Sequence, residues 1–370
     1  MNIPDGTRDV LPAEWAWRER LRGQLQTELA GWGYQGVEVP ALEFQDPAHP
    51  LDHRAFKLMD RGGEVLALRS EFTTAIGRLV RSRFAGLPYP IRLQYAGKLW
   101  QRRLTTEAEP GRLREYSQVG VELMGVSDAR SDAELVAVAR AALERVGLRA
   151  HLEVGHPGFV DAVLEDAGVG PGERVDLHLA IDRKAPADLR SRLDRLGASP
   201  EVARTLEALI ELYGGPEVLP EAARLPLGPL ARAGLARLSA VVERVGDPTL
   251  GVDLGMSRRY TYYTGFTFRA DAPGVNLPNL GGGRYDGGLP GAGFALGLER
   301  LTLALGGVPP APGETVLAFD PASARWAQAQ GLVAELVWTD DPAALAWYAS
   351  TRGITRLARG ERLETLEVEA

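Results

Sequence analysis

Two polar side chains, Gln118 and Glu122, lie four residues apart in a segment, residues 114–124, whose pattern predicts a β-strand. Alternate residues of a strand face the same side, so Gln118, Gly120 and Glu122 share one face. Burying an amide and a carboxylate together on a central strand costs free energy unless both groups meet polar partners. The pair therefore indicates a ligand site more strongly than an ordinary core.

A second group of polar residues precedes a helix that is predicted over residues 74–82. Glu71 can pair with an ammonium group, and Thr73 can donate or accept a hydrogen bond beside it. The simpler interpretation is a solvated helix start, because Ser70, Glu71 and Thr73 all suit the first turn of a helix. The residues alone leave both interpretations open.

A third group lies within residues 253–305. The Tyr262-Tyr263 pair leads into phenylalanines at alternate positions, which is the spacing of a strand. Three consecutive glycines, residues 281–283, leave a backbone that can come close to a ligand. The plainer interpretations are that the tyrosines are sheet residues and the glycines a tight hairpin. Residues 293–300 then carry small residues into an apolar helix with Arg300 near its start.

Hydrophobic periodicity predicts the elements that must hold these residues. Helices are expected at residues 14–29, 74–82, 131–146 and 159–167, and strands at 34–42, 91–100, 114–124 and 150–154. The helix at 131–146 is expected to open on a capping residue, and a hairpin is expected around Gly62-Gly63. Residues 169–245 are almost purely helical, residues 306–313 read as a linker, and residues 314–370 predict a small β-α-β-α-β tail.

The amino-acid composition is typical of a globular protein. The 370 residues are 45% hydrophobic and 25% charged, which is ordinary for a globular protein of two or more domains. A chain without cysteine forms no disulfide and fits a cytoplasmic location. We expect no signal peptide and no membrane span, because no suitable apolar run occurs. The formal net charge of −7 lowers the expectation of nucleic-acid binding without removing it.

The five histidines show no spacing typical of a metal site. His49 and His53 are four residues apart, but Pro47 and Pro50 disfavour a shared helix face, so both are interpreted as loop residues. His156 is interpreted in the same way. We expect neither a metal nor a cofactor.

The tyrosine pair, the glycines and residues 293–300, in this order, resemble the C-terminal part of the catalytic core of class II histidyl-tRNA synthetases, and the resemblance covers roughly residues 1–305. The resemblance implies an α+β fold in which an antiparallel sheet is flanked by helices. It implies a helical insertion at about 169–245 and a short α/β C-terminal domain at 314–370. It also implies a histidine-binding site made of Glu71, Thr73, Gln118, Glu122, Arg258, Tyr262 and Tyr263.

The sequence departs from that family at the expected nucleotide site. The arginine that grips the α-phosphate of ATP in the family falls on Gln101, and the glutamate two positions later falls on Arg103. Arg102 would replace the arginine only after a one-residue slip, which turns a strand side chain to the opposite face. Glutamine brings no charge to a phosphate. The resemblance thus predicts a vestigial nucleotide site at Gln101, Arg103, Arg112 and Arg300.

Two smaller departures and a second major one, in the C-terminal tail, accompany it. Ser70 stands where the family has proline, and Arg259 and Thr261 replace a glycine and an aspartate. The tail occupies the place of the anticodon-binding domain, but it is short, acidic in its later part and without a basic patch. These features oppose a function in tRNA recognition.

A retained amino-acid pocket beside a lost nucleotide site resembles the family of ATP phosphoribosyltransferase regulatory subunits, which are paralogues of the synthetases. The resemblance implies a non-catalytic, histidine-sensing subunit that partners a short-form catalytic subunit at the first step of histidine biosynthesis. It implies a cytoplasmic hetero-oligomer, with a homodimer through the core, and no nucleic acid or membrane as partner. The alternatives are an active histidyl-tRNA synthetase and a paralogue that ligates an amino acid to a non-tRNA acceptor.

Overall fold

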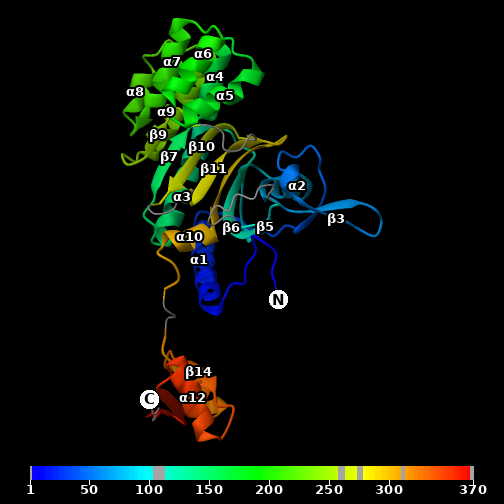
Figure 1. Cartoon of the computed structure of the whole chain (residues 1–370), viewed down its shortest axis with the longest axis vertical. Coiled ribbons are helices and arrows are strands. Elements are labelled where there is room, and N and C mark those ends of the chain that lie inside the picture. Colours follow the sequence, from blue (N-terminus) through cyan, green and yellow to red (C-terminus); the bar gives the residue numbers. More distant parts are fainter. Residues whose placement is uncertain (1, 103–112, 257–262, 273–277, 310–312, 367–370) are drawn as a thin grey trace. The chain divides into compact units, whose positions relative to one another are not determined.

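A computed structural model describes residues 2–102, 113–256, 263–272, 278–309 and 313–366 of the chain (Figure 1). The chain divides into two compact units, Met1–Val308 and Pro309–Ala370. Each unit has its own sheet and its own buried core.

The first unit is built on a nine-stranded sheet with the order β1-β5-β6-β12-β11-β10-β7-β9-β8. Neighbouring strands are antiparallel except β1 with β5 and β7 with β9, which are parallel. The centre of the sheet therefore matches the antiparallel sheet that was expected, whereas the sheet as a whole is mixed. The strands are β1 (Gln35–Gly36), β5 (Ile91–Trp100), β6 (Glu115–Met124), β7 (His151–Gly155), β8 (Tyr213–Gly214), β9 (Gly251–Asp253), β10 (Tyr263–Asp271), β11 (Leu280–Asp286) and β12 (Pro290–Gly297).

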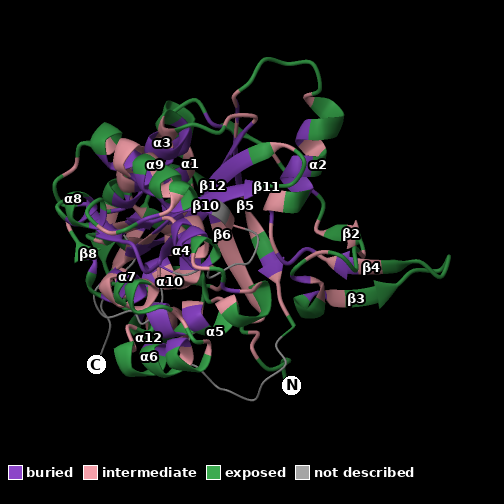
Figure 2. Ribbon diagram, turned by 90° about the horizontal axis from the view of Figure 1, so that it is seen from above, coloured by how far each residue is buried: buried purple, intermediate pink, exposed green. Residues whose placement is uncertain are grey.

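Helices α1 (Pro12–Gly31) and α3 (Ala129–Arg145) cover one face of the central strands. Alternate residues of β6, such as Val121, pack there with Leu25 of α1 and Leu135 of α3, and all three are fully buried. Figure 2 shows this burial along the central strands and the helices beside them. The polar residues at the intervening positions of β6 consequently face the other side of the sheet.

The other face of the sheet carries α2 (Thr73–Arg83) over one end. Ile76 of α2 and the preceding Phe72 pack with Leu93 and Tyr95 of β5 in a second apolar cluster. Beside α2 lies a small antiparallel sheet of order β2-β4-β3, made of β2 (Leu42–Phe44), β3 (Phe56–Met59) and β4 (Val65–Leu68), with the short helix η1 (Asp52–Arg54) before β3. The hairpin expected around Gly62-Gly63 is the β3–β4 connection.

The predicted helical stretch after residue 169 forms most of the remaining helices of the first unit. They are α5 (Pro171–Asp182), α6 (Pro186–Arg195), α7 (Pro200–Glu211), α8 (Val218–Ala222) and α9 (Pro229–Val245), and α4 (Pro157–Asp166) precedes them. Proline stands in the first turn of α5, α6, α7 and α9, where an amide hydrogen has no helical acceptor. Helix α10 (Leu298–Ala304) follows β12 directly.

Two local predictions were wrong. The strand expected at 34–42 is interrupted, because only Gln35–Gly36 and Leu42–Phe44 are strands, and the Val39 carbonyl between them accepts a hydrogen bond from the Arg69 side chain. The helix expected from residue 131 begins earlier, since Asp128 is its N-cap and accepts from the backbone amide of Ser131 in a capping box.

The second unit holds a four-stranded sheet of order β14-β13-β15-β16. Helices α11 (Pro321–Ala329) and α12 (Pro342–Arg352) pack in separate apolar clusters on β13 (Thr315–Ala318), β14 (Val333–Leu336) and β15 (Arg356–Arg359). The predicted β-α-β-α-β order is present, and an antiparallel β16 (Arg362–Thr365) follows it, which the sequence did not predict. Within the described ranges of the chain, no helix is long and apolar enough to cross a membrane.

Candidate ligand-binding site

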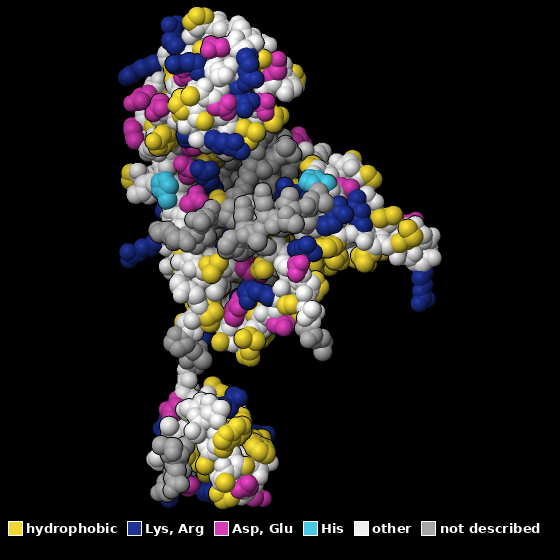
Figure 3. Space-filling view, viewed as in Figure 1, with side chains coloured by type: hydrophobic (Ala, Val, Ile, Leu, Met, Phe, Trp, Pro, Cys, Tyr) yellow, Lys and Arg dark blue, Asp and Glu magenta, His cyan; other side chains and the backbone are white. Residues whose placement is uncertain are grey.

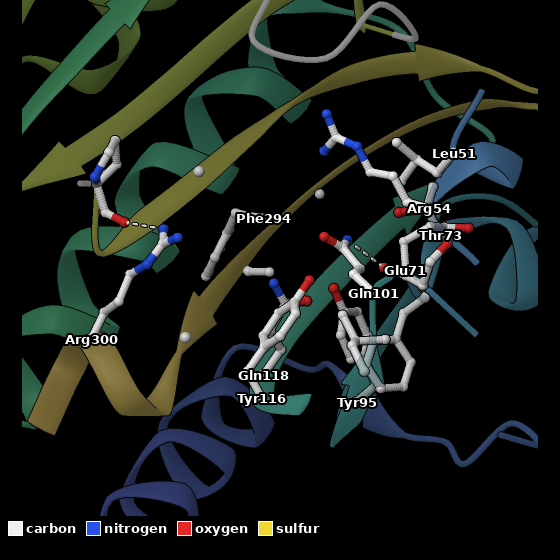
Figure 4. Close-up of a pocket in the computed structure, with 18 of the residues that line it drawn as sticks. Leu51, Arg54, Glu71, Thr73, Tyr95, Gln101, Tyr116, Gln118, Phe294 and Arg300 are labelled. Atoms are coloured by element: carbon white, nitrogen blue, oxygen red, sulfur yellow. Dashed lines mark hydrogen bonds between the residues drawn. The ribbon is translucent and has the colours of Figure 1, made fainter. Parts of the chain in front are cut away.

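A cavity of about 530 Å³ lies on the face of the sheet that α1 and α3 do not cover. Its lining includes seven of the residues expected in the histidine and nucleotide sites: Glu71, Thr73, Gln101, Gln118, Glu122, Tyr263 and Arg300. Figure 4 shows Arg300 on one side of this cavity, and Glu71 and Thr73 on the other. We call the part around Glu71, Thr73 and Glu122 the carboxylate end, and the part around Glu299 and Arg300 the arginine end.

Glu122 is the most buried charged residue at the carboxylate end, with 2% of its surface exposed. It projects from the middle of β6 and accepts hydrogen bonds from Thr73 Oγ1 at 2.8 Å and from the Tyr285 hydroxyl at 2.5 Å. Burial raises the pKa of Glu122 to about 7, although the two hydrogen bonds act in the opposite direction. Near neutral pH this carboxyl group therefore exchanges between a hydrogen-bond acceptor and a donor.

Small residues of β11 and β12 give the cavity its floor. Register places Gly293 opposite both Glu122 and Gly283, so the three residues share a face. A Cβ atom on Gly293 would lie 2.2 Å from the Val121 carbonyl oxygen and 2.4 Å from Glu122 Oε2. A Cβ atom on Gly283 would lie 2.8 Å from the ring of Tyr263. The glycines are therefore required by the polar side chains that cross above them.

Glu71 and Thr73 stand at the start of α2. The Glu71 carboxylate accepts from the backbone amide of Thr74 at 3.0 Å, so it does stabilise the helix start, as the simpler interpretation had it. Both side chains nevertheless line the cavity. Burial by itself would raise the pKa of Glu71, but hydrogen bonds from His49 and Thr74 outweigh burial and leave this pKa below its ordinary value. A negative charge is thus maintained at this end of the cavity.

Gln118 and Tyr263 complete the described part of the expected histidine site. Gln118 is half-buried and lies in register with Gly97 of β5 and Gly297 of β12, so its amide faces the cavity between two residues without side chains. Tyr263 opens β10 and is paired with Tyr285 of β11. The remaining expected residues of that site, Arg258 and Tyr262, lie outside the described residues.

Of the four residues expected at the nucleotide site, the structure describes Gln101 and Arg300. The side-chain amide of Gln101 donates to the Ser70 carbonyl at 3.0 Å, which ties it to the segment that carries Glu71. Arg300 donates from Nη1 to the Pro278 carbonyl at 3.0 Å, and both bonds are drawn in Figure 4. Arg103 and Arg112 lie outside the described residues. Gln101 and Arg300 are placed far apart on the cavity wall in this view.

At the arginine end, Glu299 is held by internal partners. Both of its carboxylate oxygens accept from the Ser117 backbone amide at 3.0 Å, and Oε1 also lies 3.0 Å from Arg18 Nη1 of α1. Arg18 is itself 8% exposed and lies 2.9 Å from Glu14. The negative charge of Glu299 is therefore neutralised within the fold, although its residue lines the cavity.

Comparison with known proteins assigns a family to this fold and cavity. The family model described as histidyl-tRNA synthetase matches residues 6–301. An ATP phosphoribosyltransferase regulatory subunit of Deinococcus radiodurans is 57% identical over 367 residues, which are 98% of this chain and 89% of the relative. The chain belongs to the ATP phosphoribosyltransferase regulatory subunit family. A second member, from Thermus thermophilus, is 47% identical over 368 residues and covers 99% of both chains.

A solved structure supports the same assignment for the fold. It is described as an ATP phosphoribosyltransferase regulatory subunit/histidyl-tRNA synthetase from Bacillus halodurans C, and it matches with a TM-score of 0.82 at 29% identity. The match covers 94% of this chain and 96% of that chain. The class II synthetase-like fold expected from the sequence is thereby confirmed, and the family name fits a regulatory role in histidine biosynthesis.

Several residues in or beside the cavity of this family member were missed by reasoning from sequence. Tyr285 bonds Glu122, and it could have been found, because it follows Gly281 and Gly283 at alternate positions of one strand. Tyr95 stacks on Phe72 with ring centroids 4.2 Å apart and also lines the cavity. His49 was interpreted only as a loop residue, but its ring also contacts Glu71. No local sequence pattern predicts this contact.

The arrangement can hold a small zwitterionic or cationic ligand. The carboxylate end offers two acidic side chains, Glu71 and Glu122, and the lining also includes Thr73, which carries a hydroxyl, and Gln118, which carries an amide. Among the residues that the structure describes, no group of three or more His, Cys, Asp or Glu side chains could hold a metal ion. Carboxylates in such surroundings can accept hydrogen bonds from ligand N–H groups.

Proposed function

We propose that the chain is a non-catalytic, histidine-sensing subunit that works with a short-form catalytic subunit of ATP phosphoribosyltransferase in the cytoplasm. The observation that carries this proposal is the contrast within one cavity. Two carboxylates with hydrogen-bonded surroundings face it at one end, and Gln101, also in its lining, carries an uncharged amide. The resemblance to the synthetases implies a phosphate-binding arginine at that position. The family relationship supports the regulatory part of the proposal.

Histidine suits the carboxylate end group by group. Its α-ammonium would pair with Glu71 and Thr73, and an imidazole N–H would donate to Glu122. Gln118 and Arg258 would meet the α-carboxylate side of the ligand, with Tyr262 and Tyr263 beside the ring. A donor approaching Glu122 stabilises the charged form of a carboxyl group whose pKa already lies near neutral pH.

Adenylate formation is not part of the proposed function. Stabilising the charge that develops on a transferred phosphoryl or adenylyl group depends on fixed cations, and removal of one such contact can cost roughly 10²–10³ in rate. Gln101 supplies no cation, and its amide donates to the Ser70 carbonyl. The second candidate, an active histidyl-tRNA synthetase, is favoured by Arg300, which lines the cavity. Histidine-dependent ATP–pyrophosphate exchange separates the two candidates.

We infer that two copies of the chain associate through the β2-β4-β3 sheet. Register puts Leu42 and Phe44 of β2 on the same face as Leu58 of β3, with apolar β4 residues between them. These three side chains are 47%, 73% and 48% exposed, respectively, an unusual amount of apolar surface for one small sheet. Phe44→Asp should convert dimers to monomers in sedimentation experiments, whereas Met59→Asp, on the opposite face and also exposed, should not.

Nucleic acid is not among the proposed partners. On the face shown in Figure 3, acidic and basic side chains are mixed over the helical insertion rather than separated into a basic stripe. A protein that binds nucleic acid gains most of its affinity from such clustered cations. The proposed partner is instead the short-form catalytic subunit, whose activity histidine would modify through this chain.

The experiment that tests the proposal measures phosphoribosyl transfer by the short-form catalytic subunit mixed with this chain. Activity should need this chain and should fall when histidine is added, with a coupling of about 1–3 kcal/mol, or roughly 5–150-fold in affinity. A Glu71→Ala, Glu122→Ala double variant should still support transfer but should lose the histidine response. Equal inhibition of both mixtures would place the sensing site elsewhere.

A further inference from the structure

His49 lies outside the lining of the cavity but contacts a residue that lines it. Its Nε2 atom lies 3.0 Å from Thr74 Oγ1 and 3.4 Å from Glu71 Oε1. The side chains of His49 and Glu71 are 18% and 17% exposed, so the contact is largely shielded from solvent. Glu71 is the residue to which the proposed function gives the ligand ammonium.

The backbone around His49 fixes the orientation of its ring. The Leu51 amide donates to Nδ1 at 3.0 Å, so Nδ1 must carry a lone pair and the ring proton of the neutral form lies on Nε2. The His49 amide donates to the Asp46 carbonyl at 3.0 Å, and the Asp52 amide donates to the His49 carbonyl at 2.9 Å. The Nε2–H group is thereby held toward Glu71 and Thr74.

We propose that His49 is a positioning residue for amino-acid binding: its Nε2–H group fixes the Glu71 carboxylate against α2, and a second ring proton weakens binding of the ligand ammonium. The inference rests on the proposed function, because it assigns a supporting residue to the same site. With Thr74 on one side and His49 on another, Glu71 keeps its remaining acceptor capacity for the cavity. A charged His49 would compete with the ammonium for that carboxylate.

The charges that face His49 come from four segments. The groups are Glu71 before α2, Glu43 of β2, and Asp46 and Asp52 of the turn and of η1. The hydrogen bond to Glu71, followed by the nearby carboxylates, raises the pKa of His49, and burial opposes this. The Leu51 amide also favours the neutral ring, since protonation of Nδ1 removes its acceptor. These contacts therefore link the protonation of His49 to the charge on Glu71.

The binding experiment compares histidine affinities of the wild type, His49→Gln and His49→Ala by calorimetry at about pH 6 and about pH 8.5. The glutamine amide can donate from nearly the same place as Nε2 but cannot be charged. At the higher pH, His49→Gln should bind within about threefold of wild type, and His49→Ala should bind about tenfold more weakly. At the lower pH, the wild type should lose about fivefold relative to His49→Gln. Histidine and Glu122 also titrate between these pH values, but they do so in both proteins. Their effect therefore cancels in the ratio of the wild-type affinity to the His49→Gln affinity.

Two results would overturn the proposal. One is wild-type affinity of His49→Ala at both pH values, and the other is an equal, pH-independent loss in both variants, as expected from a purely structural role. If the wild type shows no histidine heat, the proposed function fails, and the contact itself is judged by NMR. The ring signal assigned by its loss in His49→Gln should then titrate at lower pH in Glu71→Gln than in wild type, because the hydrogen bond to Glu71 raises the pKa of His49. An unchanged titration curve would refute the coupling of His49 to Glu71.

Discussion

The two ends of the cavity differ in what their charged groups are bound to. At the carboxylate end, Glu71 and Glu122 accept hydrogen bonds from hydroxyl, amide and imidazole donors, and within the described ranges of the chain none of these donors is a lysine or an arginine. At the arginine end, Glu299 is paired with Arg18 and Arg300 donates to a backbone carbonyl. One end thus keeps its negative charge available for a ligand, and the other uses charged groups to hold the fold together.

The largest expected effect comes from Glu122→Ala. Removal of the buried acceptor leaves the imidazole N–H of a bound histidine without a partner, which should cost about 3 kcal/mol, or more than about 100-fold in affinity. Calorimetry with histidine measures this loss. The matched control is Glu115→Ala, on the same strand but in a surface ion pair with Lys98, which should leave the affinity unchanged. Comparable losses in both variants would contradict the role given to the carboxylate end.

A second change, Glu122→Gln, tests how much the buried negative charge of Glu122 lowers the free energy of unfolding of the protein without ligand. Burial raises the pKa of Glu122 to about 7, above its value in the unfolded chain. The folded state therefore binds the proton more tightly, and the stability this provides is present below about pH 4.5 and lost as the pH rises through about 7. From about pH 5 to about pH 8, the free energy of unfolding should shift by about 2–3 kcal/mol in favour of the variant. Urea titrations at both pH values measure the shift, and parallel curves would contradict it.

A smaller effect is expected at Gln101. Its amide holds the Ser70 carbonyl, so Gln101→Ala should loosen the segment that carries Glu71 and weaken histidine binding by about 1 kcal/mol, or roughly fivefold. The Gln101→Glu variant is a useful companion, because it keeps the size of the side chain but cannot donate. A complete loss of binding in Gln101→Ala would contradict this supporting role and would indicate that Gln101 contacts the bound histidine directly.

The smallest effect is expected at the arginine end. Arg300→Ala removes a side chain that donates to the Pro278 carbonyl on the side of the cavity opposite Glu71. Histidine affinity should change by no more than about twofold, which is within the range of ordinary surface substitutions. If Arg300→Ala lost as much histidine affinity as is expected for Glu122→Ala, the claim that only the carboxylate end binds the ligand would be contradicted.

The sequence predicted the elements with strong local periodicity well. The strand expected at 91–100 coincides with β5, and alternation placed Gln118 and Glu122 on one face of β6, with Val121 on the other. The tight hairpin offered for residues 281–283 is not observed, because these glycines lie inside β11. Their missing side chains make room for residues of neighbouring strands, such as Tyr263 and Phe294.

The rest depends on contacts between residues far apart in the chain. Glu122 meets Tyr285, and Glu71 meets His49, through tertiary packing that no short pattern encodes. The interruption of the strand expected at 34–42 likewise involves Arg69, whose guanidinium binds the Val39 and Lys98 carbonyls. Such residues become visible only once the sheet has brought separate segments together.

The central claim is that histidine binds at the carboxylate end without being activated. The most direct measurement is histidine-dependent ATP–pyrophosphate exchange by the purified chain, at a histidine concentration that calorimetry shows to be saturating. No exchange above the level seen without histidine is predicted, because Gln101 places no cation on the α-phosphate. Robust exchange that depends on histidine would contradict the account and identify the chain as an active synthetase.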